Sequence, residues 1–408
     1  MVKKAEVNRM QENSFPLQGL KVIDLATMMA APWAATYLAD YGAEVIKVEH
    51  PKTGDVLRKF GAMKDGKAVF WKTIARNKKC ITLDLKKGKE VFLKLIQWAD
   101  VLIENFRPGT MEKWGVGWDV LSEVNPRLIW LRVSGFGQEG PYATRGGFGT
   151  VAEGMSGFAG LNGYPDTPPT LPPNALADGV CSAYAAMAIM MAIYERDVLG
   201  SNKGQVIDIS LYEPLLRLME SNLMEYSVLG IKANRMGSRI VSAAPRNLYQ
   251  TKENKWVGIS GSSQPIAENV FRAIGRPELI DDPRFCDNPS RVKNVEALDA
   301  VIGAWVGQHT LEEVMEQFLQ ANAVVGPIYE VDQIFEDEQV KARESFVEIE
   351  DKDFGAIKLP NMVAKFSRTP GAVKFTGGDK GQYNKEIYCD LLGLTPEELL
   401  QLQEDEVV

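Results

Sequence analysis

The sequence predicts an α/β protein with a parallel sheet and a second, smaller α+β domain. Over the first 135 residues, short β-branched runs alternate with helical stretches. Apolar strands separated by helices of about ten residues indicate βαβ units and a parallel sheet covered on both faces. After residue 225 the chain becomes turn-rich, and this change marks the smaller domain.

Five runs are predicted to form strands of the parallel sheet. In chain order they are LKVIDLA, AEVIKVE, CITLDL, DVLIEN and RLIWLRVSGFG, and a further strand is expected at QVIDISL. PWAATYLADYG and KGKEVFLKLIQWA are helical between them, and Pro32 suits a first helical turn. Residues 179–196 are predicted to form a buried helix, apolar on nearly every face. A second long helix is expected from Tyr212 to Leu229.

The smaller domain combines short strands with capped helices. Strands are expected at Leu248–Gln250 and Trp256–Ser260, and helices at Pro265–Ile274 and Leu311–Ala321. Thr310 and Glu313 form a capping box before the last of these. The predicted limits are 1–215 for the first part of the large domain, 225–325 for the small domain and 330–408 for completion of the large domain.

Composition narrows the class of protein. The chain has 408 residues, which suits two or three domains, and its 45% hydrophobic and 25% charged residues are typical of a soluble globular protein. A net charge of −8 argues against general affinity for nucleic acid or an anionic membrane. The first twenty residues resemble no signal peptide, and the apolar run Ala183–Tyr194 is shorter than the ~18 residues of a membrane span. A cytoplasmic protein without a membrane partner is expected.

Few residues are available for metal or triad chemistry. The four cysteines are far apart, without a CxxC pair, and the histidines are His50 and His309 alone. A histidine-rich metal site and a serine–histidine triad are therefore excluded, and no metal is expected. Any chemistry must use carboxylates or the backbone.

The glycine motif SGFGQEGP contains Gly135, Gly137 and Gly140 in GxGxxG spacing directly after a predicted strand. A dinucleotide site needs such glycines to open a helix. Here Pro141 and YATRGG follow, and these favour a loop. The motif therefore argues against a nicotinamide or flavin site.

Basic turns follow several predicted strands. NFRPGTMEKWG comes after DVLIE, at the carboxyl end of a strand, where open α/β sheets bind ligands. An ordinary βα turn with solvated charges is the alternative at this point. Several such turns in an acidic protein favour a pocket for a phosphorylated ligand. The donors are Asn105, Arg107 and Lys113, with Lys47, His50, Lys52 and Arg145 in other turns.

Asp178 in NALADGVCSAYAA permits two interpretations. Aspartate is a preferred N-cap, and its charge suits the start of the following helix. A carboxylate held there can also act as a covalent nucleophile, with room for an electrophile beside Ala175, Ala177 and Gly179. The residues alone leave both interpretations open.

Five segments together resemble the family III coenzyme A transferases. They are LKVIDLATMMAAPWAATYLADYGAEVIKVEHPKTGD, NKKCITLDLK, VLIENFRPGTMEKWGV, NPRLIWLRVSGFGQEGP and ALADGVCSAYAA. The similarity runs in order from about Leu17 to the C-terminus. It implies a Rossmann-like large domain with a parallel sheet formed from both chain ends, a small domain on linkers, and an interlocked dimer.

The resemblance also implies a mechanism and a set of contacts. Asp178 would attack an acyl-CoA such as succinyl-CoA, and an aspartyl-CoA thioester would follow. Gly261 would belong to a covering loop of the small domain. The implied coenzyme A contacts are Met29, His50, Leu83, Lys86, Asn105, Phe106, Arg107, Lys113, Arg145 and Phe148.

Some positions depart from the family pattern. His50 stands where an arginine is common, and Gly149 where an acidic side chain is often found. Phe148 and Gly149 also replace the His-Asp pair that the racemase branch uses for proton transfer. The resemblance therefore favours a transferase, and α-methylacyl-CoA racemase is an alternative. A catalytically silent partner subunit of a hetero-oligomer is the other alternative.

The acceptor acid is expected to be apolar or aromatic, of the benzylsuccinate or phenyllactate type. Met28, Met29, Trp33 and the segment GFAGLNGYP suggest such a pocket.

Overall fold

The computed structural model describes residues 15–408, and two compact units are distinguished in the chain. Residues 1–14, part of the segment in which we expect no signal peptide, lie outside the described residues. The larger unit contains the chain up to Ala159, then Leu171–Ile231 and Ala342–Val408. The smaller unit contains Gly160–Thr170 and Lys232–Lys341.

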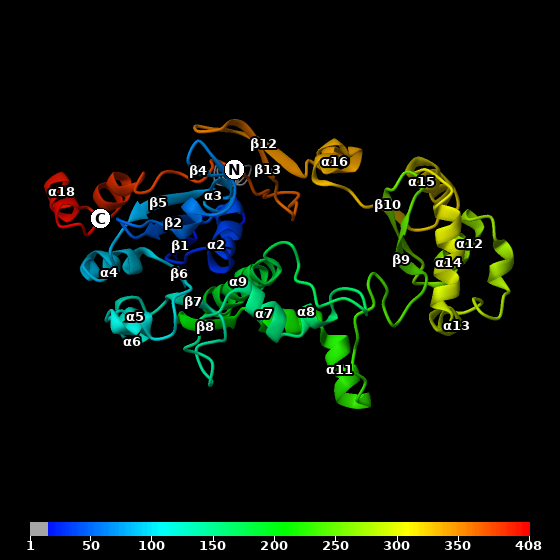
Figure 1. Ribbon diagram of the computed structural model, residues 1–408. Helices are drawn as coiled ribbons and strands as arrows, with labels where there is room; N and C mark the ends of the chain where they lie inside the picture. Colours follow the sequence, from blue (N-terminus) through cyan, green and yellow to red (C-terminus); the bar gives the residue numbers. More distant parts are fainter. Residues whose placement is uncertain (1–14) are drawn as a thin grey trace, which may run out of the picture. The chain divides into compact units, whose positions relative to one another are not determined.

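A six-stranded parallel sheet forms the centre of the larger unit, as predicted (Figure 1). The expectation that both chain ends supply its strands is wrong: all six lie between Lys21 and Ser210, and the C-terminal part contributes helices and a separate two-stranded sheet. The strands lie in the order β5-β2-β1-β6-β7-β8. Renumbered along the chain this order is 3-2-1-4-5-6, that of a doubly wound Rossmann fold. The strands are β1 (Lys21–Asp24), β2 (Glu44–Glu49), β5 (Lys78–Thr82), β6 (Val101–Glu104), β7 (Ile129–Ser134) and β8 (Gln205–Ser210).

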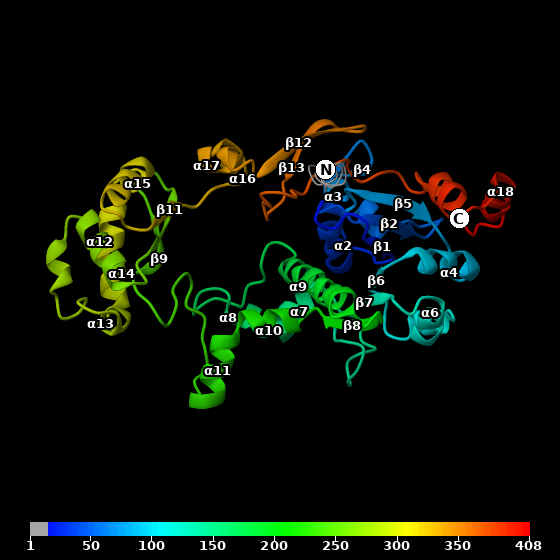
Figure 2. The same cartoon turned by 180° about the vertical axis from the view of Figure 1, so that it is seen from behind.

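Helices cover both faces of this sheet because its strands are apolar on both sides. On one face α2 (Ala30–Asp40) and α9 (Leu176–Ile193) lie side by side in both views (Figures 1 and 2). The other face packs against α4 (Lys89–Trp98), α6 (Trp118–Val124), the π-helix η4 (Glu386–Leu391) and α18 (Pro396–Glu404). The residues after 342 thus complete the core that the first 130 residues begin.

Helix α9 differs from its predicted form. It begins at Leu176 with Ala175 as N-cap, and a π-helix, η2 (Tyr194–Val198), continues it. Together they form 23 residues, long and apolar enough to cross a membrane by length and composition, and the most apolar stretch of 18 among them has a mean hydropathy of 1.7. Only a third of that stretch is buried, so the prediction of a helix buried all round is wrong. Met191 and Tyr194 are exposed, whereas Ala177, Cys181 and Ala185 face the core.

The predicted helix Tyr212–Leu229 is two helices. It breaks at Met219 into α10 (Glu213–Leu218) and α11 (Glu220–Leu229). The remaining elements of the larger unit are short. They are η1 (Val56–Lys59), β3 (Met63–Lys64), β4 (Lys67–Ala68), α3 (Val69–Ile74), α5 (Thr110–Lys113), α7 (Gly149–Met155), α8 (Phe158–Leu161), β12 (Phe346–Asp351) and β13 (Gly355–Pro360).

The smaller unit has its own core around a three-stranded antiparallel sheet, β11-β10-β9. The capping box of Thr310 and Glu313 is present at α15. Within this unit Gly160–Thr170 is joined to the later segment, since Gly237 N donates to Gly163 O at 2.9 Å. Its elements are β9 (Arg246–Gln250), β10 (Trp256–Ser260), α12 (Gln264–Ala273), η3 (Pro277–Ile280), α13 (Asn288–Lys293), α14 (Val295–Val306), α15 (Leu311–Gln320), β11 (Val325–Pro327), α16 (Val331–Glu336) and α17 (Glu338–Ala342).

Candidate active site

A cavity of about 410 Å³ opens at the carboxyl ends of β1, β6, β7 and β8. Residues 27–30, which follow β1, and residues 105–108, which follow β6, form facing walls. The chain order of the strands reverses between β1 and β6, and this is where open α/β sheets bind ligands. Asp178 is the one carboxylate among the residues that line this cavity in the described chain.

Asp178 lies in the first turn of α9, and it is not the N-cap. The helix has no side-chain cap from Ala175; instead Glu153 Oε1, on α7, accepts the backbone N–H of Ala177 at 3.2 Å. Burial raises the pKa of Asp178, the backbone N–H of Ala30 lowers it, and the charge of Glu153 raises it. The carboxylate is thus partly desolvated at the meeting point of three helix N-termini.

Gly149, the first residue of α7, gives the carboxylate of Asp178 its space. A Cβ atom at position 149 would lie 2.6 Å from Asp178 Oδ2, closer than real Cβ contacts come. No side chain longer than a hydrogen fits between α7 and the carboxylate as it is placed.

The glycines of SGFGQEGP form a loop, as their sequence context predicts. Gly135 and Gly147 touch backbone to backbone, because a Cβ on Gly135 would lie 2.7 Å from the Cα of Gly147. Gly137 and Gly140 have φ of +89° and +88°. Backbone in this region favours glycine. The loop thereby folds back and brings residues 145–148 into the cavity wall.

Two arginines in the cavity wall carry charge for an anionic ligand. Neither Arg107 nor Arg145 forms an ion pair with a carboxylate within residues 15–408. The guanidinium of Arg145 instead stacks on Tyr142, 3.6 Å from the ring centre. In contrast, Arg132 on β7 is paired with Glu104 at 2.8 Å and with Glu112 at 2.7 Å.

Burial raises the pKa of Glu104 to about 7, against the lowering effect of Arg132. Its carboxylate also accepts the backbone N–H of Phe106 at 2.6 Å. This buried group thus holds the turn that presents Arg107.

Comparison with known proteins shows the family of the chain. The sequence model described as CoA-transferase family III matches residues 17–382. The chain belongs to CoA-transferase family III. Its similarity to the succinyl-CoA–D-citramalate CoA-transferase of Chloroflexus aurantiacus is 40% identity over 396 residues, covering 96% of this chain and 98% of the relative. The chain is also 38% identical over 401 residues to the succinyl-CoA–L-malate CoA-transferase beta subunit of Chloroflexus aurantiacus. This match covers 97% of this chain and 98% of the relative.

A solved structure supports the same assignment. The CAIB/BAIF family protein from Brucella suis superposes with a TM-score of 0.81 at 31% identity, covering 93% of this chain and 100% of that one. The chain is therefore a CoA-transferase of the α/β fold, and its substrates include a CoA thioester and a carboxylate. Within residues 15–408, no group of three or more His, Cys, Asp or Glu side chains is placed to hold a metal.

The cavity of the transferase brings together seven of the residues predicted for the site. They are Met29, Asn105, Phe106, Arg107, Arg145, Phe148 and Asp178. Both polar atoms of the Asn105 side chain are engaged by Thr27: Oδ1 accepts its N–H at 2.9 Å, and Nδ2 donates to its O at 2.7 Å. Asn105 thus joins the two walls of the cavity.

The other predicted residues lie outside the cavity lining. His50 follows β2 and Lys86 follows β5, and Asp84 contacts both: His50 Nε2 is 3.6 Å from Asp84 Oδ2, and Lys86 N donates to Asp84 Oδ1. Leu83 is 2% exposed and belongs to the core.

Lys113 is exposed at the end of α5. Gly261 belongs to the smaller unit, where its N–H donates to Pro245 O at 2.6 Å.

Sequence reasoning missed Glu153 and Thr27. Glu153 stands in TVAEGMS, where nothing local separates a buried carboxylate from a solvated one. Its partner on α9 is 24 residues away. Thr27 is hydrogen-bonded to Asn105 through its backbone N–H and carbonyl, so its side-chain type gives no indication of this contact in the sequence.

Proposed function

We propose that the chain transfers coenzyme A from succinyl-CoA to a carboxylic acid, with Asp178 as the covalent nucleophile. The observation that carries the proposal is the position of Asp178: a partly desolvated carboxylate in a cavity that two unpaired arginines also line. Two relatives named for transfer from succinyl-CoA support the choice of donor.

The proposed reaction needs no net proton. An Asp178 oxygen attacks the thioester carbonyl of succinyl-CoA, the C–S bond breaks, and a mixed anhydride and CoA thiolate form. The thiolate attacks the aspartyl carbonyl, which releases succinate and leaves an aspartyl-CoA thioester. The acceptor carboxylate then displaces the thiolate to form a second anhydride, and the thiolate takes the acceptor acyl group. Asp178 is regenerated as a carboxylate.

The remaining predicted contacts are proposed to hold coenzyme A. Arg107 and Arg145 face the cavity with their charges unpaired, and they suit a phosphate group. The turns with His50, Lys86 and Lys113 lie beyond the cavity and would meet a more distant part of the coenzyme. Gly261 is proposed to belong to the loop that covers the intermediate.

For the acceptor we propose a dicarboxylic acid of four or five carbons. D-citramalate and L-malate in the names of the two relatives support this choice. An apolar or aromatic acid is the rival, and Met28 and Met29 in the cavity wall favour it. Trp33 packs instead against a core cluster with Leu57 and Trp71. Comparing kcat/KM for malate, citramalate, benzylsuccinate and phenyllactate separates the two.

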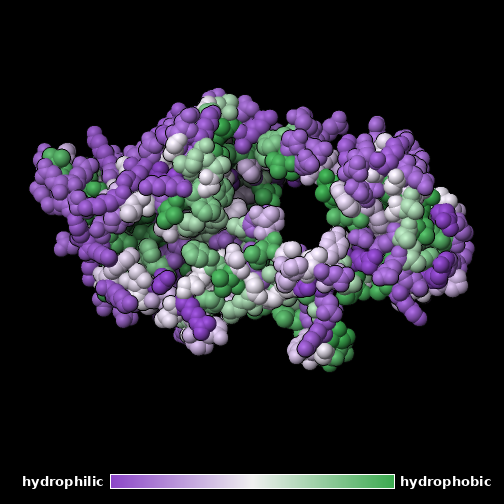
Figure 3. Space-filling view, viewed as in Figure 1, coloured by the Kyte–Doolittle hydropathy of each residue, from purple (hydrophilic) through white to green (hydrophobic). Residues whose placement is uncertain are grey.

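We further propose that two chains assemble. Helix α11 buries none of its residues, and Figure 3 shows hydrophobic residues gathered there, at the bottom of the view. Leu223, Met224, Tyr226, Val228 and Leu229 are exposed on it. Apolar patches of this kind mark interaction surfaces. The partner is proposed to be a second copy in an interlocked dimer, and activity of the purified single chain would separate it from a paralogous subunit.

The experiment that tests the function traps the intermediate. The protein is incubated with succinyl-CoA, hydroxylamine is added, and the peptide spanning Leu171–Arg196 is examined by mass spectrometry. A hydroxamate at Asp178 is expected. The Asp178→Asn variant should keep its melting temperature and lose transfer, and it must be checked for deamidation. A label on another carboxylate, or none during turnover, rejects the assignment.

A further inference from the structure

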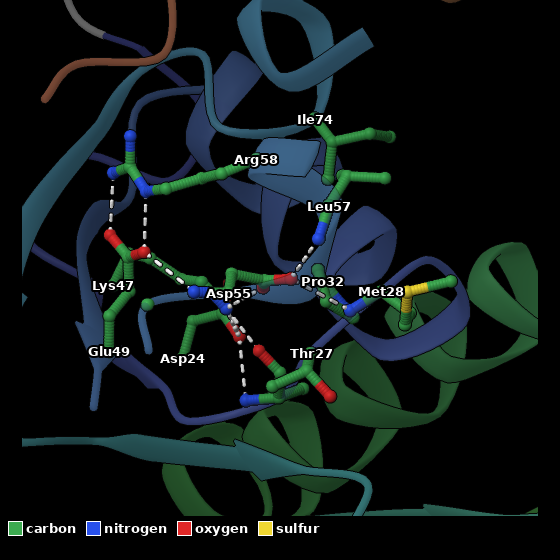
Figure 4. A network of polar contacts seen from close by, with 12 residues as sticks. Asp24, Thr27, Met28, Pro32, Lys47, Glu49, Asp55, Leu57, Arg58 and Ile74 are labelled. Carbon is green, nitrogen blue, oxygen red and sulfur yellow. Dashed lines mark hydrogen bonds and ion pairs between the residues drawn. The ribbon is translucent and has the colours of Figure 1, made fainter. Parts of the chain in front are cut away.

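Six charged side chains are packed beside the loop that joins β1 to α2. All of them except Lys78 are labelled in Figure 4. None of them lines the cavity. Three are cationic and three anionic, so the cluster is balanced. They are Asp24, Lys47, Glu49, Asp55, Arg58 and Lys78.

Two buried ammonium groups hold the ends of this loop. Lys47 donates to Ala26 O and lies 3.0 Å from Asp55 Oδ2 and 3.7 Å from Asp24 Oδ1. Burial would lower the pKa of Lys47, but Asp24 and Asp55 raise it above its ordinary value. Lys78 donates to Asp24 Oδ2 at 2.9 Å and to Pro32 O, in the first turn of α2, at 2.5 Å. The carbonyls on both sides of the loop are therefore fixed.

Asp55 holds the middle of the loop. Its Oδ1 accepts the backbone N–H of Met28 at 3.3 Å and that of Leu57 at 2.8 Å. Met28 has φ of +66°, a left-handed conformation that a residue with a side chain keeps only where its surroundings impose it. From the opposite side, Asn105 holds both backbone groups of Thr27. The loop is thus fixed at consecutive residues.

The loop leads directly to the catalytic carboxylate. Met29 is the N-cap of α2 and Ala30 is its first residue. Ala30 and Asp178 line the same cavity, and the backbone N–H of Ala30 lowers the pKa of Asp178. A change in the path of residues 26–29 would move this donor. The contact that lowers the pKa of Asp178 therefore depends on a residue that is not in the cavity.

We propose that Asp55 is a positioning residue of the transferase: with Lys47 it fixes the loop Ala26–Met29 so that the N–H of Ala30 meets the carboxylate of Asp178. The proposal rests on the proposed function, since it assumes that Asp178 is the nucleophile. A purely structural role for the Lys47–Asp55 pair is the alternative. The two differ in what a conservative change does to the chemistry of Asp178.

The test uses the Asp55→Asn variant of the full chain. Asparagine keeps an acceptor for Met28 and Leu57 but removes the charge opposite Lys47. We expect kcat to fall about ten- to a hundredfold, as a small displacement near reacting atoms does. The KM for succinyl-CoA should change less than about threefold, because the cavity walls that bind it remain. Hydroxylamine-trapped label at Asp178 should form more slowly in a single turnover by the same factor as kcat.

The pH dependence of kcat/KM separates the two roles, because a loss of stability alone does not shift it. Without the Ala30 donor, the pKa of Asp178 rises, and the acid limb of kcat/KM moves to higher pH. The ionisable groups around Asp178 are Glu153 on α7, Cys181 on its own helix, and Arg107 and Arg145 in the cavity wall. Asp55→Asn alters none of them directly.

Asp40→Asn is the matched control. Asp40 is also buried and paired in the larger unit, with Arg76 at 2.9 and 2.6 Å, but it lies at the other end of α2. Asp40→Asn should lower the melting temperature and leave the acid limb of the kcat/KM profile in place. If Asp55→Asn behaves like this control, the positioning role is rejected.

If Asp55→Asn does not fold, the Lys47→Met/Asp55→Asn double variant leaves Asp24–Lys78 and Glu49–Arg58 as balanced pairs and should show the same kinetic signature. Unchanged kcat and acid limb in that variant also reject the proposal. If the unmodified protein gives no label at Asp178, the proposed function fails; if both proteins are labelled at the same rate, only the positioning role fails.

Discussion

Oε1 of Glu153 lies 3.2 Å from the backbone nitrogen of Ala177, the residue directly before Asp178. Its charge raises the pKa of Asp178, so removing the charge should lower that pKa. We therefore predict that Glu153→Gln, which keeps an acceptor for Ala177, shifts the acid limb of kcat/KM to lower pH. Glu153→Ala should give the same shift and also lower stability by about 1 kcal/mol, because it removes the helix cap. Rate profiles and thermal melts of both variants check this, and an acid limb that stays in place would contradict it.

The space at Gly149 leads to a second prediction. Gly149→Ala places a Cβ 2.6 Å from the present position of Asp178 Oδ2, so the carboxylate must turn away. We expect kcat to fall about tenfold or more while the melting temperature holds, since alanine is a good helix former. Gly154→Ala in the same helix is the matched control, because a Cβ there meets nothing within 4 Å. Equal rates for the two variants would rule out a steric limit at position 149.

Arg107 should govern coenzyme affinity. A charge-assisted hydrogen bond contributes about 1.5–3 kcal/mol, so Arg107→Ala should raise the KM for every acyl-CoA roughly ten- to a hundredfold. The preference among acceptor acids should stay the same. Arg276→Ala, in which an exposed arginine paired with Glu278 is lost, serves as control. A changed acid preference with unchanged KM for acyl-CoA would mean that Arg107 contacts the acid.

Deuterium exchange distinguishes transferase from racemase chemistry. Proton abstraction beside a thioester carbonyl needs a base on each face. Asp178 is the only carboxylate in the cavity lining of the described chain, and no histidine joins it there. We predict no exchange at the α carbon when a 2-methylacyl-CoA is incubated with the protein in deuterated water. Incorporation detected by mass spectrometry at the rate of turnover would favour racemisation.

The sequence predicted five strands of the parallel sheet because each is a short apolar run between helical stretches, and it indicated a strand at QVIDISL, which the structure places at the edge of the same sheet. It also indicated the loop at Gly135, where Pro141 prevents an early helix. The interpretation of Asp178 as the N-cap was wrong for a physical reason. The helix starts two residues before Asp178, and Glu153 on another helix accepts the hydrogen bond that a cap would accept. Contacts between elements that are distant in the chain, such as Asn105 with Thr27, depend on backbone positions that a pattern of residue types does not encode.

The interrupted course of the larger unit has a consequence for biosynthesis. The chain leaves this unit at Ile231 and returns at Ala342, whereas the core of the smaller unit uses residues between Ala244 and Val325. On the ribosome the smaller unit is therefore available to fold while Tyr388, which donates to Thr82 O, is not yet made. Until then one face of the sheet lacks its last helices and exposes apolar surface. A nascent chain stalled between 342 and 388 should be the form most in need of a chaperone.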